Sequence, residues 1–269
     1  MNAATLAGPA LAGFGVVLVI AVATWMVSLA KRDVSIVDSV WSLLIFAAGC
    51  TYAATLPVAG PRAPWLLGLV ALWAARLALY ITWRNRGEPE DRRYVEIRRR
   101  NEPHFALKSL YLVFILQGVL AWIVSAPLLA AIGSERGLNG LDAAGAALLL
   151  FGLAFETIGD AQLARFRRRP GNHGQVLDSG LWRYTRHPNY FGECCVWWGV
   201  FLIAAAAGGW WAIVSPLLMT VLLLRVSGVA LLEKDIGERR PAYRAYIART
   251  NAFFPGAPRA RGASRRGGV

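Results

Sequence analysis

The sequence predicts an all-α integral membrane protein with seven transmembrane helices, and three observations support this. Of the 269 residues, 56% are hydrophobic and only 17% are charged, whereas soluble domains carry roughly 25% charged residues. Apolar runs recur along the chain at lengths near the ~20 residues that a bilayer-spanning helix needs. Basic residues are concentrated in every second connection between these runs. The composition excludes an intrinsically disordered chain, which would have low hydrophobicity.

Seven segments are expected to span the membrane. They are residues 10–30, 36–56, 65–83, 109–132, 142–163, 191–208 and 211–232. The last two follow each other almost directly around Gly209, so we expect a tight helical hairpin there. The first is not expected to be a cleaved signal peptide, because Lys31 and Arg32 follow the apolar stretch instead of preceding it.

The basic residues predict the orientation of the chain. Lys and Arg number 29 against 16 Asp and Glu, a net charge of +13, and 25 of the 29 follow the first, third, fifth and seventh expected spans. Cytoplasmic loops accumulate Lys and Arg, so the N-terminus is expected outside and the C-terminus in the cytoplasm. This one-sided distribution argues against a nucleic-acid partner, which would call for a basic binding surface.

Composition divides the chain into three expected parts. Residues 1–232 form a seven-helix catalytic domain, and residues 233–254 form a cytoplasmic helical segment that Pro241 interrupts or restarts. Residues 255–269 are rich in Gly, Pro and Arg, and we expect a disordered tail lying against anionic membrane lipids. The three cysteines show neither a disulfide framework nor the spacing of metal ligands, so no metal is expected.

Ionisable side chains inside apolar spans are costly and are therefore candidates for function. Six stand out within the expected spans, and Glu233 directly follows the last one. The six are Asp38, Arg76, Glu156, Asp160, Glu193 and Arg225. Structural ion pairs, such as one between Asp38 and Arg76, are the alternative interpretation, because a buried pair is weak evidence of function.

The spacing of the polar residues predicts a cleft. Glu156 and Asp160 are four residues apart, as are Asn189 and Glu193, so each pair shares one helix face. Arginines in the adjoining loops suit phosphate oxygens, while the carboxylates accept hydrogen bonds from hydroxyls and amides. A dinucleotide or a sulfonium nucleoside fits this description. No glycine-rich motif of the soluble nucleotide folds is present.

Most of the candidate chemistry lies in residues 180–199. This stretch reads GLWRYTRHPNYFGE over residues 180–193 and WWG over 197–199. Pro188 suits the first turn of the sixth span. Arg186 and His187 stand just before that turn, where free backbone N–H groups favour an anion.

Aromatic residues in the same region have two interpretations. Tyr184 and Tyr190 offer rings for stacking and hydroxyls for positioning a ligand. An aromatic belt at the membrane interface is the simpler reading for Trp182, Trp210 and Trp211.

These residues resemble a known family. The run at 186–193 and the WWG at 197–199 are similar to bacterial membrane proteins related to steroid 5-alpha-reductases (3-oxo-5-alpha-steroid 4-dehydrogenase-like, DUF1295 type). The wider superfamily includes the isoprenylcysteine carboxyl methyltransferases. The resemblance covers roughly residues 30–258 and implies a multi-pass protein of the bacterial inner membrane.

The resemblance implies a reductase that takes hydride from NADPH and delivers it to an electron-poor C=C. Its substrate would be lipophilic, such as a steroid or related lipid that enters from the bilayer. The residues implied in cofactor binding are Asp160, Arg167, Arg168, Tyr184, Arg186, His187, Asn189, Tyr190, Glu193, Arg225, Glu233 and Tyr243.

The substrate half departs from the steroid reductases, which polarise a carbonyl with a Gln-Glu pair and a tyrosine. This chain has no Gln-Glu dipeptide, and Trp73 stands at the tyrosine position. Asp38 is the expected catalytic acid, provided that burial keeps it protonated. Arg76 is expected nearby and would oppose this, so Tyr80 is the reserve donor.

Two other functions remain open. An S-adenosylmethionine-dependent methyltransferase acting on a lipid or thiol would share the Arg-His-Pro-x-Tyr run and Glu233. A transporter or lipid-binding scaffold is disfavoured, because the polar groups gather toward one side of the membrane. The sequence leaves open the substrate, the stereochemistry of reduction, the choice between NADPH and NADH, and the oligomeric state.

Overall fold

The computed structural model describes residues 3–172, 174–226, 228–233, 236–239 and 241–259. These residues form helices and loops without a strand, so the all-α prediction is confirmed. The chain folds into two compact units, each described by itself. The first comprises Met1–Ala143 and Phe201–Ser215, and the second comprises Ala144–Val200 and Pro216–Val269.

Within the described residues, six helical segments are long and apolar enough to cross a membrane. They are Thr5–Lys31, Ile36–Thr55, Ala63–Asn85, Phe105–Ile132, Gly140–Arg167 and Pro188–Ala206. The expected seventh span, 211–232, is represented by the shorter apolar helix Trp210–Val226 and a separate turn of helix that follows it. The chain is therefore a multi-pass membrane protein, while the seventh span and the orientation remain predictions.

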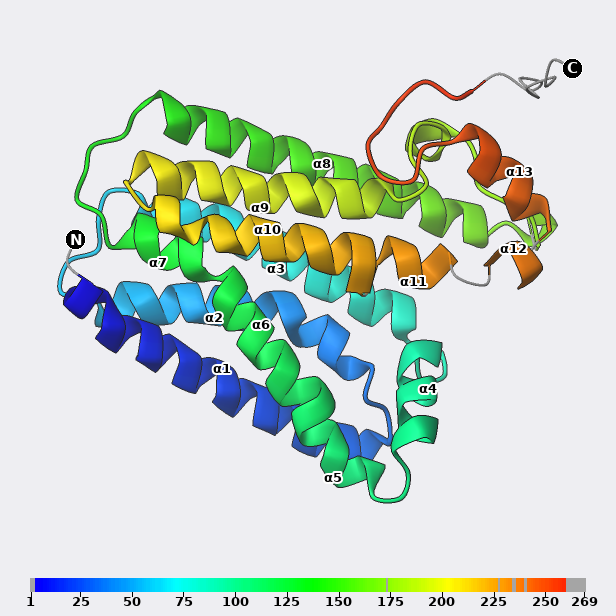
Figure 1. Ribbon diagram of the computed structural model, residues 1–269, viewed down its shortest axis with the longest axis horizontal. Helices are drawn as coiled ribbons and strands as arrows, with labels where there is room; N and C mark the ends of the chain where they lie inside the picture. Colours follow the sequence, from blue (N-terminus) through cyan, green and yellow to red (C-terminus); the bar gives the residue numbers. More distant parts are fainter. Residues whose placement is uncertain (1–2, 173, 227, 234–235, 240, 260–269) are drawn as a thin grey trace, which may run out of the picture. The chain divides into compact units, whose positions relative to one another are not determined.

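The first unit is a group of antiparallel apolar helices with one polar helix at the end (Figure 1). Helix α2 packs against both α1 and α3, and α6 packs against α1 and α2. The elements are α1 (Ala3–Lys31), α2 (Ile36–Thr55), α3 (Ala63–Asn85), α4 (Arg92–Asn101), α5 (Phe105–Ser109), the π-helical η1 (Leu110–Ile115), α6 (Leu116–Val124), α7 (Ala126–Ile132) and η4 (Trp210–Ile213).

A buried ion pair anchors one end of the first unit. The Arg62 guanidinium, fully inaccessible to solvent, donates from Nε and Nη2 to the two carboxylate oxygens of Asp142 at 2.7 Å. It also donates to the carbonyls of Arg136 and Gly137. Arg62 is one of the few basic residues on the expected outer side. Its role there is structural, because it joins the connection before α3 to the connection before α8.

The second unit is built on α8 and α9, which lie side by side in Figure 1. Shorter elements follow α9 and end in the C-terminal segment, where Pro241 caps α13. The elements are α8 (Gly140–Arg167), η2 (Pro170–Asn172), η3 (Gly180–Arg183), α9 (Pro188–Ala206), α10 (Val214–Val221), the π-helical η5 (Leu222–Val226), α11 (Val229–Glu233), α12 (Ile236–Arg239) and α13 (Ala242–Arg249). The expected disordered tail falls mainly on residues 260–269, outside the described residues.

Glycines bring α8 and α9 into backbone contact. A Cβ added at Gly152 would lie 2.5 Å from the carbonyl oxygen of Gly192, and one added at Gly192 would lie 2.6 Å from the amide nitrogen of Glu156. Seven residues along α9, Gly199 approaches the amide of Leu149 equally closely. Small residues allow such close approach between membrane helices. This spacing fixes which residues of the two helices stand at the same level.

Substituting Gly192 with alanine is expected to destabilise the protein by about 1–3 kcal/mol, because the added methyl overpacks against backbone that cannot move aside. The matched control is Gly68→Ala in α3, where no atom lies within 4 Å of the added Cβ and alanine is the better helix former. Thermal unfolding in detergent should show a lower midpoint for the first variant only. Equal midpoints would contradict the close contact.

Asp142→Asn is expected to cost about 3–5 kcal/mol, because it leaves the Arg62 guanidinium buried without its counter-charge. The control is Glu96→Gln, which removes a carboxylate from the exposed pairs with Arg99 and Arg100 and should cost less than about 1 kcal/mol. Denaturation of both variants in the same detergent measures the difference. A similar small loss in both would mean that the pair does not anchor the unit.

Candidate functional site

Four of the predicted residues meet at one level of the α8–α9 pair. Gly192 lies against Glu156, and Gly159 lies against the backbone nitrogen of Asn189. Asp160 and Glu193 directly follow these two glycines in sequence. The carboxylate residues Glu156, Asp160 and Glu193 are 2%, 3% and 6% exposed. They lie inside spans of apolar sequence, so buried polar side chains accompany the close contact of α8 and α9.

One member of the cluster has an unused acceptor. The side-chain oxygen Oδ1 of Asn189 is buried and accepts no hydrogen bond from the described residues. Leaving such a group unsatisfied costs about 1–3 kcal/mol, which a ligand with an N–H or O–H donor would recover. Among the described residues, no three His, Cys, Asp or Glu side chains are grouped to hold a metal ion.

Arg186 joins the 180–199 motif to the C-terminal part of the chain. Its guanidinium donates two hydrogen bonds of 2.7 Å to the carboxylate of Glu233. It also donates to the carbonyls of Ile247 and Thr250 at the end of α13. Burial opposes the charged form, but the Glu233 carboxylate outweighs it and raises the pKa of Arg186 above its ordinary value. Arg186 therefore stabilises the C-terminal segment.

His187 completes this ion-pair cluster. Its Nε2 lies 2.8 Å from Oε1 of Glu233, and its ring stacks on Tyr190 with centroids 5.5 Å apart. Burial alone would raise the pKa of Glu233, but hydrogen bonds from His187 and Arg186 and their charges lower it to about 2. The anion-binding mouth expected at Arg186 and His187 therefore contains a carboxylate of the protein itself, and phosphate contacts by these two residues stay a prediction.

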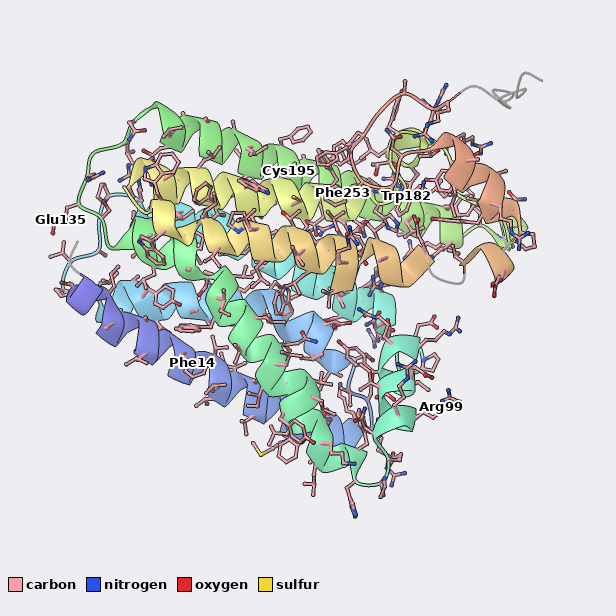
Figure 2. All side chains as sticks on the ribbon, in the orientation of Figure 1. Phe14, Arg99, Glu135, Trp182, Cys195 and Phe253 are labelled. Carbon is pink, nitrogen blue, oxygen red and sulfur yellow. The ribbon has the colours of Figure 1, made fainter. Side chains whose placement is uncertain are left out.

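The C-terminal segment closes over the motif through further hydrogen bonds. The Thr185 hydroxyl donates to the carbonyl of Phe253 at 2.8 Å, and Thr185 forms a parallel bridge with Asn251. The Tyr246 hydroxyl donates to the carbonyl of Trp182. Trp182 and Phe253 are labelled in Figure 2. Glu233 and residues 246–256 thus pack on the motif. The contact joins segments far apart in sequence, so it forms only when the chain folds.

The other predicted cofactor residues lie at the edge of this unit. Tyr243 packs edge-on against Tyr246, with ring centroids 5.2 Å apart. The remaining four are exposed and accessible to a ligand, and their roles stay predictions. They are Arg167, Arg168, Tyr184 and Arg225, the last of which lies in the π-helical η5, a geometry frequent at functional sites.

The first unit contains the predicted acid, but its partners differ from those expected. Asp38 accepts hydrogen bonds of 2.6 Å from Nη2 of Arg93 and from the hydroxyl of Tyr94. The expected pairing of Asp38 with Arg76 is therefore wrong. Arg93 lies in the connection after α3, and α4 brings it back to the start of α2.

Sequence reasoning missed Arg93, Tyr94 and Gln117. Tyr94 is buried, and its hydroxyl accepts a 3.0 Å hydrogen bond from Nε2 of Gln117. Burial and then the Asp38 charge raise the pKa of Tyr94, so the phenol keeps its proton at neutral pH. The sequence indicates Arg93 and Tyr94 only weakly as site residues. They stand in an arginine-rich loop, and the preference of basic residues for cytoplasmic loops already explains its charge.

Arg76 and Tyr80 form a separate pair on α3. They stand four residues apart, with the guanidinium 5.4 Å from the tyrosine ring centroid, a cation–π arrangement. The Arg84 guanidinium lies 5.9 Å from the same ring. Trp73, earlier on the same helix, is fully buried. Two guanidiniums therefore lie near the ring of the reserve donor Tyr80.

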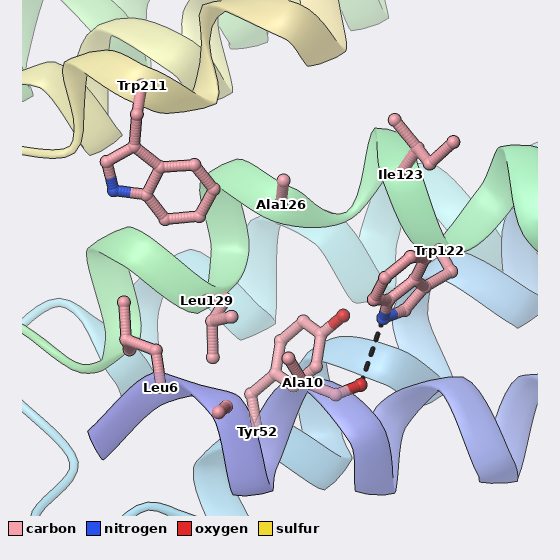
Figure 3. A pocket seen from close by; sticks show the side chains of 9 residues that line it. Leu6, Ala10, Tyr52, Trp122, Ile123, Ala126, Leu129 and Trp211 are labelled. Carbon is pink, nitrogen blue, oxygen red and sulfur yellow. Dashed lines mark hydrogen bonds between the residues drawn. The ribbon is translucent and has the colours of Figure 1, made fainter. Parts of the chain in front are cut away.

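An apolar cavity of about 520 Å³ lies in the first unit (Figure 3). Its lining comes from the first turns of α1, the end of α2, α6, α7 and η4. The Trp122 indole donates to the carbonyl of Ala10 at 2.9 Å, and the hydroxyls of Tyr52 and Ser125 hydrogen-bond to each other at 2.7 Å. With its polar groups paired in this way, the cavity presents mainly hydrocarbon and aromatic surface.

Helical fold and site together define an all-α, multi-pass membrane protein with buried carboxylates. The chain belongs to the family described as "Protein of unknown function (DUF1295)", whose model matches residues 24–250. It is similar to the uncharacterized protein C594.04c of Schizosaccharomyces pombe, with 26% identity over 261 residues, which covers 86% of this chain and 75% of that protein. No solved structure matches the chain significantly.

Acidification is expected to release the C-terminal segment as Glu233 takes up a proton. The folded pKa of about 2 lies below the ordinary value of 4.5, so this stabilisation is complete above pH 4.5 and is lost as the pH falls toward 2. It amounts to about 3 kcal/mol. Hydrogen–deuterium exchange of residues 242–256, corrected for intrinsic rates, should rise across this range.

A variant separates Glu233 from general acid unfolding. At neutral pH, Glu233→Gln should expose the segment to trypsin at Arg244 and Arg249, whereas Glu238→Gln, at an exposed position, should not. If both variants were cleaved at the wild-type rate, the ion-pair cluster would not be what holds the segment.

Proposed function

We propose that the protein is a membrane-embedded oxidoreductase that binds NADPH and transfers hydride to an activated C=C of a lipophilic substrate. The observation that carries this proposal is the buried polar cluster of α8 and α9, with the unused acceptor of Asn189 at its level. A buried cluster of acceptors in apolar spans suits a ligand that carries several donors.

NADPH offers several donors that suit such a cluster. The carboxamide N–H groups of its nicotinamide and the hydroxyls of its riboses are suited to Asn189 Oδ1 and to the carboxylates Asp160 and Glu193. Arg167, the last residue of α8, and Arg168, in the turn after it, are exposed and suit the phosphates. The resemblance of the 186–199 motif to steroid 5-alpha-reductases supports the same ligand.

When bound, NADPH supplies a hydride to the β-carbon of an enone. The enolate that results must be stabilised and protonated by groups of the protein. In the first unit, Tyr94 and Tyr80 are phenols that carry the required proton. Asp38, paired with Arg93, accepts a hydrogen bond from Tyr94 and would orient that phenol or act as the acid itself.

The cavity of the first unit supports a lipophilic substrate. Tyr52 at the cavity and Asp38 lie on the same helix, α2, 14 residues apart, which corresponds to about 21 Å along the axis. A substrate that filled the cavity and reached Asp38 would therefore be an elongated lipid. A steroid with a long side chain, an unsaturated acyl chain and an isoprenoid enone satisfy this requirement.

We also propose seven spans, with the Trp210–Val226 helix as part of the seventh. The arginine-rich ends would lie in the cytoplasm, following the distribution of basic loops. The membrane would be the inner membrane of a bacterium, as the resemblance implies.

The first test is nucleotide binding by the purified protein in detergent, followed by nicotinamide fluorescence. Asn189→Leu should weaken NADPH binding by about three- to tenfold, the worth of one hydrogen bond, and Glu193→Ala should weaken it as well. Glu96→Gln, on the exposed face of α4, is the control and should bind as the wild type does.

The second test is turnover, measured as NADPH oxidation with a panel of lipophilic enones. Asp38→Asn, Tyr94→Phe and Tyr80→Phe should lower the rate while leaving NADPH affinity near the wild-type value. Unchanged activity in both Asp38→Asn and Glu193→Ala would refute the site assignment. Binding of isotope-labelled S-adenosylmethionine, with none of NADPH, would replace the proposal by a methyltransferase.

A further inference from the structure

A second pocket lies in the second unit, at the C-terminal end of α8. Its volume is about 190 Å³, and its polar lining comes from Gln162, Arg165, Arg169 and Ser179. Arg165 lies in the last turn of α8, Arg169 lies just after the helix ends at Arg167, and both line the pocket. Neither was among the residues that the sequence predicted to bind the cofactor.

The two guanidiniums carry charge that nothing in the described part of the chain neutralises. Two other arginines of this unit are paired: Arg249 forms an ion pair with Asp178, and Arg186 forms one with Glu233. No hydrogen bond or ion pair joins the Arg165 or Arg169 side chain to a described residue. Because the nearby Asp178 carboxylate is occupied by Arg249, the pocket itself keeps a net positive charge.

The uncharged polar groups of the pocket are also donors. Gln162 spends its Oε1 on the backbone N–H of Leu181, at 2.9 Å, which leaves its amide Nε2 without a partner among the described residues. The Ser179 hydroxyl makes no hydrogen bond as a helix cap. Two guanidiniums, an amide and a hydroxyl therefore line the pocket, and such a set of donors fits an anion.

The backbone at Gly180 preserves this arrangement. Gly180 has φ +61°, in the left-handed region, and an added Cβ would lie 2.5 Å from the Gln162 amide. A side chain at this position would displace Gln162 from the pocket. Phe166 and Leu177 supply an apolar wall beside the donors, suited to a base, a ribose carbon or a glycerol carbon next to the anion.

We propose that this pocket binds a phosphate monoester, held by Arg165 and Arg169 with help from Gln162 and Ser179. Arginines that only set the orientation of a membrane protein need no shared pocket and no uncharged donors beside them. Two sources carry the required group: the 2′-phosphate that distinguishes NADPH from NADH, and the headgroup of an anionic lipid such as phosphatidic acid. The nucleotide source rests on the function proposed above, whereas the pocket does not.

The test compares the wild type with Arg165→Gln/Arg169→Gln and with a control of equal charge change, Arg99→Gln/Arg100→Gln, from the exposed face of α4. In the first arm, Kd is measured for NADPH and NADH. If the pocket takes the 2′-phosphate, the pocket variant raises the Kd of NADPH by about 10- to 100-fold and leaves that of NADH unchanged. The control variant changes neither.

In the second arm, native mass spectrometry measures retention of phosphatidic acid against phosphatidylcholine. Loss of phosphatidic acid in the pocket variant, with the ratio of NADPH to NADH affinity unchanged, assigns the pocket to a lipid headgroup. Gln162→Leu, which keeps both charges, should weaken whichever ligand the first variant identifies. Unfolding temperatures equal to that of the wild type, measured in detergent, show that the variants are folded.

The proposal is overturned if the pocket variant keeps both the nucleotide ratio and the phosphatidic acid retention of the control. If the wild type binds neither nicotinamide nucleotide, the proposed oxidoreductase function fails. The phosphatidic acid arm then still decides whether the pocket binds a phosphate monoester.

Discussion

Charged groups in apolar helices have no water to solvate them, and this constraint organises both units of the protein. Each buried charge that the structure describes must find a partner within the fold or in a ligand. Arg62 satisfies it with Asp142 and two carbonyls. Asp38 satisfies it with Arg93 and Tyr94, and Glu233 with Arg186 and His187. These pairs join segments far apart in sequence, so they determine which connections pack together.

The close packing of α8 and α9 gives the candidate site its shape. Where Gly152 and Gly192 meet, the two backbones touch, and the carboxylates on either side have little freedom to move. Such rigidity favours a preorganised binding site, because a ligand then pays less to order its contacts. The same glycines leave no room for larger residues, so stability and binding depend on a single packing arrangement.

The 180–199 motif serves a structural purpose as well as the proposed catalytic one. Arg186 and Thr185 bind carbonyls of the C-terminal segment, while Asn189 and Glu193, a turn further along, lie inside the unit. The first residues of this motif therefore bind the C-terminal segment, and the later ones contribute to the polar cluster. Variants at Arg186 would change both the position of the C-terminal segment and the site, whereas variants at Asn189 test ligand binding more directly.

The sequence by itself determined the properties that follow from composition and from helical periodicity. These are the apolar segments of spanning length, the polar pairs at i and i+4, the helix start at Pro188 and the family motif. These depend on local spacing, and the helices of both units agree with it. Only the tertiary structure decided the partners of the charges. In the fold, Asp38 pairs with Arg93 instead of Arg76, and Arg186 pairs with Glu233. Arg165 and Arg169 line one pocket. Helix period predicts the face on which a side chain stands, but its partner depends on how distant segments pack, and no local pattern contains that information.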